Sequence, residues 1–147
     1  MNWKWSNVPV PEACVAVLVV GVIVHLFLPL MFFSELWLAH VVGWPLIAAG
    51  VLVVVWAVRT VKDMDISKPT RVISTGPYAF SRNPMYVSWM PIYVGIAFII
   101  NTVWLVLLMP AVLIFTHYFI IIPEEQYLER RFGDDYRRYR DRVRRYL

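Results

Sequence analysis

Three long stretches of the chain carry no charged side chain, and they constrain its fold more than any other feature. They cover residues 13–33, 36–58 and 83–123. A helix needs about 20 mostly apolar residues to cross a bilayer, so each of the first two stretches predicts one membrane span and the third predicts two. With 60% hydrophobic residues and a mean hydropathy of +0.61, the composition excludes an ordinary soluble domain.

The sequence therefore predicts an all-α integral membrane protein with a single membrane domain over residues 1–147. Asn101 and Thr102 are the expected turn within the third stretch. The third span is short and contains Pro91, so it is expected to be tilted, kinked or buried against its neighbours. The four spans are expected near residues 12–33, 36–61, 84–100 and 102–122, with a loop over residues 62–83 and a tail over residues 123–147.

The basic residues predict how the chain is oriented in a multi-pass topology. Apart from Lys4, the 14 lysines and arginines fall within residues 59–82 and 130–145. The positive-inside rule places both ends of the sequence and the loop 62–83 on the cytoplasmic side of an inner or plasma membrane. The net charge of +4 does not indicate nucleic acid, because these residues lie beside predicted spans, where anionic membrane lipids are the nearer partner.

The loop before the third span contains the segment TGPYAFSRNPMY, residues 75–86. Long loops inside a small bundle are more often functional than idle. Taken alone, Arg82 is more typical of a helix end anchored among lipid phosphates, and Tyr78 and Tyr86 suit an interfacial aromatic belt. This segment by itself does not define a function.

The tail reads PEEQYLERRFGDDYRRYRDRVRRYL and predicts an amphipathic helix, which Gly133 would divide into two segments. Such a helix can simply lie on lipid headgroups. Two adjacent carboxylates, Glu124 and Glu125, are costly at a membrane boundary unless cations or hydrogen-bond donors meet them, and Arg82 is expected on the same face. Neighbouring helical positions point about 100° apart, so one glutamate can face a pocket while the other pairs elsewhere.

No metal site is expected. Cys14 is the single cysteine, and the three histidines are scattered without the spacing of metal ligands. His117 lies two turns before Glu124 and could share its face, which makes it a candidate contact for a substrate. Trp89, close to Tyr86, is a second candidate, at an access slot for lipids.

The motifs of the second half together resemble the isoprenylcysteine carboxyl methyltransferase family and its phospholipid methyltransferase relatives. The resemblance covers roughly residues 70–146. Asn83 replaces the family histidine and cannot titrate near neutral pH, and Ser88 replaces a glycine. The matching residues, in order, are Arg82, Asn83, Pro84, Met85, Tyr86, Glu124, Glu125, Leu128, Phe132, Gly133, Tyr136, Tyr139 and Val143.

The resemblance implies an integral membrane methyltransferase that uses S-adenosylmethionine without a dinucleotide-binding domain, and the sequence has no G-x-G-x-x-G motif. It assigns Arg82 and Glu125 to catalysis, with Glu125 orienting Arg82, whereas Trp89 and His117 remain substrate candidates from their positions alone. The implied cofactor-binding residues are Gly76, Tyr78, Asn83, Pro84, Tyr86, Glu124, Tyr136 and Tyr139.

The acceptor is expected to be lipophilic, with an isoprenylcysteine-type carboxylate as the first candidate and a phospholipid amine or a small thiol as alternatives. Two other functions remain open. One is a nicotinamide-dependent membrane reductase, and the other is a non-catalytic membrane protein whose basic tail binds lipid. The sequence does not indicate an oligomeric state.

Overall fold

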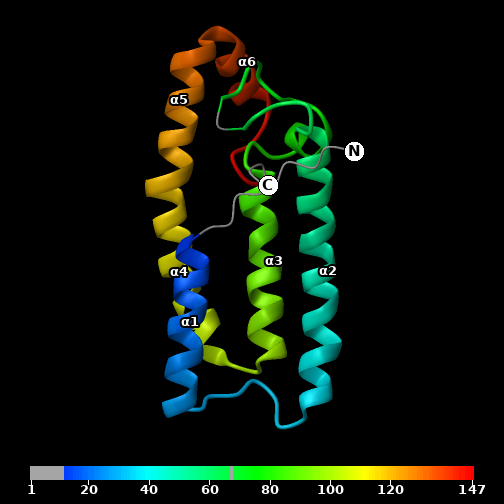
Figure 1. Ribbon diagram of the computed structural model, residues 1–147, viewed down its shortest axis with the longest axis vertical. Helices are drawn as coiled ribbons and strands as arrows, with labels where there is room; N and C mark the ends of the chain where they lie inside the picture. The colour runs from blue at the N-terminus through cyan, green and yellow to red at the C-terminus, as the bar shows by residue number, and fades with distance from the viewer. Residues whose placement is uncertain (1–11, 67) are drawn as a thin grey trace.

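The computed structural model of the protein describes residues 12–66 and 68–147. The described residues form helices and loops without a β-strand, which confirms the all-α fold. Neighbouring helices of the four-helix bundle run in opposite directions, so that the loop 62–83 and the last two helices lie at one end (Figure 1). Lys4 lies outside the described residues. The bundle consists of α1 (Glu12–Phe27), α2 (Leu36–Thr60), α3 (Pro84–Ile99) and the helix that begins with α4 (Val103–Phe115).

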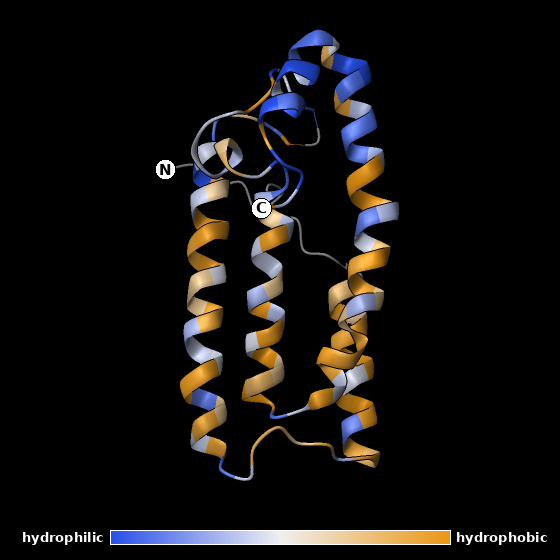
Figure 2. Ribbon diagram, turned by 180° about the vertical axis from the view of Figure 1, so that it is seen from behind, coloured by the Kyte–Doolittle hydropathy of each residue, from blue (hydrophilic) through white to orange (hydrophobic). Residues whose placement is uncertain are grey.

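Two of these helices are long and apolar enough to cross a bilayer. They are α2, with 25 residues, and the 30-residue helix that begins with α4. The apolar helices α1 and α3 have 16 residues each, fewer than the about 20 that a span needs. The number of four spans is therefore not confirmed. Figure 2 shows hydrophobic residues along the bundle and hydrophilic residues at the end that carries the loop.

The first helix ends earlier than the sequence predicts. It stops at Phe27 instead of extending to residue 33, because Pro29 disfavours helical backbone at the residue before it. The residues after the helix then pack beside the start of α4. The backbone N–H of Val103 donates to the carbonyl of Leu30 over 2.9 Å, and the indole N–H of Trp104 donates to that of Leu28 over 2.6 Å.

Asn101 forms the turn between α3 and α4, as the sequence predicts. Its φ of 56° is left-handed, a conformation that asparagine tolerates better than most residues. Its buried side chain accepts hydrogen bonds from the N–H groups of Phe32 and Phe33 over 3.0 and 3.1 Å, and it donates to the carbonyl of Phe33 over 2.7 Å. One amide thereby joins both loops at this end of the bundle.

The last helix of the bundle does not end at Pro123, where the sequence places the start of the tail. It continues through η3, a π-helical turn (Thr116–Ile121), into α5 (Ile122–Phe132). Pro123 has no N–H to donate, and in η3 the N–H of Ile122 reaches back five residues to the carbonyl of His117. The wider turn lets the helix pass the proline. At ~1.5 Å per residue the 30-residue helix is ~45 Å long, so α5 extends beyond a bilayer core.

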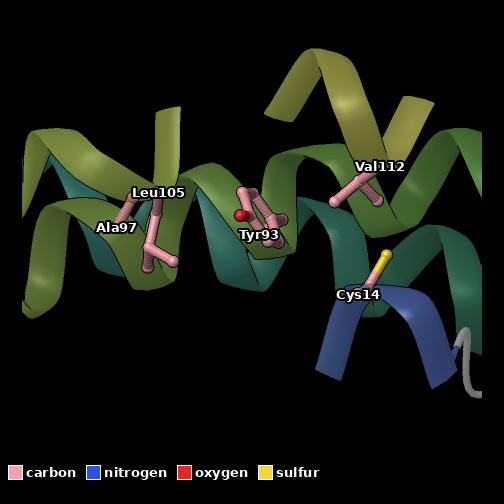
Figure 3. Close-up of a cluster of buried hydrophobic side chains, with 5 residues drawn as sticks. All are labelled: Cys14, Tyr93, Ala97, Leu105 and Val112. Atoms are coloured by element: carbon pink, nitrogen blue, oxygen red, sulfur yellow. The ribbon is translucent and has the colours of Figure 1, made fainter. Parts of the chain in front are cut away.

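Helices α2 and α3 touch backbone to backbone through small residues. A methyl group added at Gly50 would lie 2.6 Å from the carbonyl oxygen of Ser88, and one at Gly95 would lie 2.7 Å from that of Gly43. A separate apolar cluster joins α1, α3 and α4 (Figure 3). Its buried members are Cys14, Tyr93, Ala97, Leu105 and Val112.

Candidate active site

The loop before α3 is shaped by Gly76. Its φ of +60° is left-handed, and a side chain there would lie 2.6 Å from the hydroxyl oxygen of Thr60. From this glycine the chain forms the short helix η2 (Gly76–Ala79), whose Tyr78 carbonyl accepts a hydrogen bond of 2.8 Å from the hydroxyl of Tyr139. The absence of a side chain at Gly76 therefore lets the loop backbone lie close to Thr60 of α2.

The chain reverses direction between α5 and α6 (Asp134–Arg142), where Gly133 adopts a φ of 53°. This turn divides the predicted amphipathic helix where the sequence places the break. It folds α6 back toward the loop (Figure 1) and buries Tyr136 and Tyr139. The helix does not continue to Tyr146, because Val143 is already extended, with φ −119° and ψ 131°.

Glu125 is the centre of the polar contacts in the site. The side chain is buried, and its carboxylate accepts a hydrogen bond of 3.3 Å from the side-chain amide of Asn83. Arg145 donates two hydrogen bonds to its Oε2, of 3.1 Å from Nε and 2.9 Å from Nη2. Arg82 Nε lies 3.4 Å from Oε1. Two guanidinium groups thus offset the cost of burying this carboxylate.

Arg82 is only partly satisfied by these contacts. Its side chain is 9% exposed, and its Nη1 is buried without a hydrogen-bond partner among the described residues. Nε lies within ion-pair distance of Glu125 but is not aligned for a hydrogen bond. A buried guanidinium with an unmet donor is costly, and it is suited to receive an anionic group from a ligand.

Glu124 points away from Glu125 and contacts α3 instead. Its Oε2 accepts a hydrogen bond of 3.2 Å from the hydroxyl of Tyr86. Burial raises the pKa of the Glu124 carboxyl; the hydrogen bond from Tyr86 lowers it, and the nearby charge of Glu125 raises it. Ionised Glu124 is therefore a carboxylate that a cationic ligand would stabilise.

The tyrosines around this cluster remain neutral phenols at physiological pH. Burial, together with the charge of Glu125, raises the pKa of Tyr136 to about 12. Burial also raises the pKa of Tyr78 and Tyr139. These residues can therefore offer uncharged aromatic faces and hydroxyl donors to a ligand.

These residues line a cavity of about 80 Å³ between the loop, α5 and α6, which we call the polar cavity because Arg82, Glu124 and Glu125 face it beside apolar residues of the loop. Seven of the residues implied by the resemblance line it. They are Tyr78, Arg82, Asn83, Glu124, Glu125, Tyr136 and Tyr139. The sequence motifs, although separated along the chain, are therefore adjacent in space.

A second and larger cavity, of about 610 Å³, lies between α1, α3 and the helix of α4 and η3. Its walls are mostly apolar or aromatic. Trp89 and His117, the two candidate substrate contacts, line it, and so does Tyr86. Tyr86 therefore lines the apolar cavity while its hydroxyl contacts Glu124, which lines the polar cavity.

The structure also places some implied residues outside the polar cavity. Gly76 and Pro84 line neither cavity. Pro84 is buried as the first residue of α3, where its missing N–H is not needed. Tyr86 belongs to the apolar cavity, although the resemblance implies a contact with the cofactor.

Sequence reasoning missed two residues of the site. Arg145 bonds Glu125, and the hydroxyl of Tyr146 is hydrogen bonded to Nδ1 of His117. Arg145 stands among several arginines in the tail, so no local pattern distinguishes it. The only signal is that Tyr146 follows Tyr139 and Val143 at helical spacing, although the chain is not helical there.

Comparison with known proteins identifies the motifs at family level. The model of a family described as phospholipid methyltransferase matches residues 38–135, more than half of the chain. The match extends to α2 and ends just before Tyr136. Searches of curated proteins and of solved structures found no significant match.

Proposed function

The chain belongs to the phospholipid methyltransferase family, and we propose that it transfers a methyl group from S-adenosylmethionine to a lipophilic acceptor at the cytoplasmic boundary of the membrane. One observation carries this proposal. The hydrogen bond between Tyr86 and Glu124 joins a polar cavity suited to the cofactor to an apolar cavity suited to the acceptor.

The polar cavity offers groups that complement the cofactor. Arg82 Nη1 is an unmet buried donor for the methionyl carboxylate. Glu124 can accept from the ammonium group or the ribose hydroxyls. The faces of Tyr78 and Tyr136 suit adenine or the positive sulfonium. The buried residues of the cavity therefore fit a ligand with both an anionic and a cationic group.

The size of this cavity implies a movement. Its volume of about 80 Å³ is well below the roughly 300 Å³ or more typical of ligand pockets. Its outer wall includes Ile66, Val72 and Ile73 of the loop. We expect residues 68–75 to move away from α5 when the cofactor binds, and hydrogen exchange in this segment to change on binding.

The apolar cavity suits an acceptor that comes from the bilayer. Its volume of about 610 Å³ is within the range of small-molecule sites, and Trp89 and Met90 on its wall belong to α3. The family description makes the amine of a phospholipid the first acceptor to test. An isoprenylcysteine-type carboxylate and a small thiol are the alternatives.

Methyl transfer requires alignment more than difficult chemistry. When bound, the cofactor supplies an electrophilic methyl group on a sulfonium. The residues of this chain must hold the acceptor in line with that group and exclude water. In this proposal Glu125 orients Arg82, and Tyr86 positions Glu124 at the junction between the cavities.

The need for a base depends on the acceptor. A carboxylate attacks in its ionised form, whereas an amine or thiol must first lose a proton. Asn83 cannot take that proton near neutral pH. His117, on the wall of the apolar cavity, is a candidate base.

The decisive experiment is calorimetric titration of the full chain in detergent with S-adenosylmethionine, beside a titration with a reduced nicotinamide cofactor. Saturable binding of S-adenosylmethionine, lost in Arg82→Gln and Tyr136→Ala but kept in Arg138→Gln, would support the proposal. Arg138 is a suitable control because it pairs with Asp135 on the exposed side of α6. Thermal unfolding of each variant checks that it is folded.

The other outcomes favour the other functions. Binding of the nicotinamide cofactor alone would indicate a reductase. No binding of either cofactor to folded protein would overturn the proposal and leave the lipid-binding role. If S-adenosylmethionine binds, transfer of a labelled methyl group to ethanolamine phospholipid, isoprenylcysteine analogue or thiol identifies the acceptor.

A further inference from the structure

Residues 143–147 cross the candidate site as a non-helical segment after α6. The N–H of Arg82 donates to the carbonyl of Arg144 over 2.9 Å. The carbonyl of Arg145 accepts from the hydroxyl of Ser81 over 3.3 Å and from the amide of Asn83 over 3.2 Å. The backbone of the segment is therefore bonded to the three residues that precede α3.

The side chains of the same segment reach both cavities. Arg145 donates its two hydrogen bonds to Glu125 on the wall of the polar cavity. The next residue, Tyr146, is bonded to His117 and lines the apolar cavity together with Leu147. Adjacent residues of one segment therefore contact the two halves of the proposed site.

We propose that residues 143–147 form a strap that couples the two cavities, with Arg145 as a positioning residue for Glu125 and Tyr146 as a gate to His117. This inference rests on the proposed function, which assigns the polar cavity to the cofactor and the apolar cavity to the acceptor.

The contacts of Glu125 support the role of Arg145. Arg145 makes two aligned hydrogen bonds to one carboxylate oxygen, whereas Arg82 lies 3.4 Å from the other and keeps an unmet Nη1. Arg145 thus holds the carboxylate in place while Arg82 keeps a donor for a ligand. Arg145 itself needs no contact with the cofactor to fulfil this role.

The contacts of Tyr146 support the role of a gate. Its side chain is half-exposed and is tied to the bundle through the hydrogen bond to His117. An acceptor headgroup that bonds His117 Nδ1 must displace this hydroxyl. Because the Tyr146 backbone follows Arg145 directly, its displacement pulls on the residue that orients Glu125.

The test compares four variants of the full chain in detergent: Arg145→Gln, Arg145→Lys, Tyr146→Phe and the control Arg138→Gln. Cofactor affinity is measured by titration, and the KM and kcat for the acceptor are measured with the acceptor found above. Hydrogen exchange at residues 81–83 is followed without ligands, because the N–H of Arg82 reports directly on docking of the strap.

We expect Arg145→Gln to weaken cofactor binding by roughly tenfold, the effect of losing a hydrogen bond to a charged group, with partial rescue by Arg145→Lys. Tyr146→Phe should leave cofactor affinity within about twofold, because Arg145 keeps its two bonds to Glu125. It should lower the acceptor KM several-fold, because no hydroxyl competes for His117. Both Arg145→Gln and Tyr146→Phe should speed exchange at residues 81–83, and Arg138→Gln should not.

Several results would overturn the proposal that residues 143–147 act as a strap. One is unchanged exchange at residues 81–83 in both Arg145→Gln and Tyr146→Phe. Another is an Arg145→Gln variant that binds cofactor as the control does, and a third is a Tyr146→Phe variant with an unchanged KM. If the wild type binds no S-adenosylmethionine, the proposed function fails, whereas the exchange measurement still decides whether the segment is docked and coupled.

Discussion

The hydroxyl of Tyr86 and the carboxylate of Glu124 meet at 3.2 Å, and this contact links the wall of the apolar cavity, lined by Tyr86, to the wall of the polar cavity, lined by Glu124. The two residues come from α3 and α5, and 38 positions separate them in the sequence. In the proposed function, the acceptor and the cofactor would therefore meet close to this pair.

Removing the hydroxyl of Tyr86 should weaken cofactor binding. In Tyr86→Phe the Glu124 carboxylate loses a hydrogen bond that favours its ionised form, so we expect the dissociation constant for S-adenosylmethionine to rise roughly tenfold. Titration calorimetry measures it. Tyr127→Phe is the matched control, because Tyr127 lies on the exposed side of α5. An equal effect of both variants would contradict a specific role for Tyr86.

Cofactor binding should also depend on pH through Glu124. Burial raises the pKa of this carboxyl, so its ionised form, which attracts a cationic ligand, is lost at a higher pH than for an ordinary glutamate. Affinity should therefore fall as the pH is lowered from 8 toward 5. Glu124→Gln should bind S-adenosylmethionine more weakly, and its affinity should change less with pH. A pH profile equal to that of the wild type would exclude Glu124 as the source of the pH dependence.

The same shift has the opposite sign for the ligand-free protein. A carboxyl whose pKa is higher in the folded than in the unfolded state stabilises the fold below its unfolded pKa. That contribution is lost as the pH rises through the folded pKa. Thermal unfolding without ligand should thus show a smaller loss of stability between pH 5 and 8 in Glu124→Gln than in the wild type.

Neutralising Glu125 should destabilise the fold. Glu125→Gln leaves Arg82 and Arg145 without their shared carboxylate, and removing one partner of a buried ion pair costs about 3 kcal/mol or more. We expect a clear fall in the unfolding midpoint at a fixed heating rate in detergent. Glu129→Gln, on the same helix, should cost below about 1 kcal/mol, because its pairs with Arg137 and Arg140 are exposed. Equal midpoints for the two variants would contradict this account.

The contact between α2 and α3 predicts a third stability effect. In Gly50→Ala the added methyl group would lie 2.5 Å from the side chain of Ile92 and 2.6 Å from the Ser88 carbonyl, so the helices must separate. A cost of about 1–3 kcal/mol is expected from such overpacking. Ala48→Val places added volume on the exposed face of the same helix and should leave the unfolding midpoint nearly unchanged.

Local sequence signals predicted those parts of the fold that depend on single residues. Asn101 marks a turn because asparagine tolerates left-handed backbone, and Gly133 divides the tail because glycine, without a Cβ, adopts positive φ at no steric cost. At Pro123 the sequence misled, because a change from apolar to charged residues marks a change of environment and not the end of a helix. The π-helical turn η3 (Thr116–Ile121) accommodates the proline, and a hydropathy pattern does not reveal it.

The residues of the candidate site could be predicted where they belong to sequence motifs. They could not be predicted where they depend on contacts between distant parts of the chain. Glu125 and Arg82 could be paired from their expected place on one membrane face. The bond between Arg145 and Glu125 joins residues 20 positions apart, and Arg145 lies on a non-helical segment that the helical pattern assigns to a helix. Such a contact depends on the turn at Gly133, so periodicity cannot specify it.

The glycine contacts of α2 and α3 have a mechanical consequence. Two helices that touch through Gly43, Gly50 and Gly95 cannot slide or separate without breaking close backbone contact, so they behave as a fixed frame. The apolar cavity lies on the other side of α3, against α1 and the helix of α4 and η3. Any change in the width of that cavity therefore has to come from α1 or from the helix of α4 and η3, because α3 is held against α2.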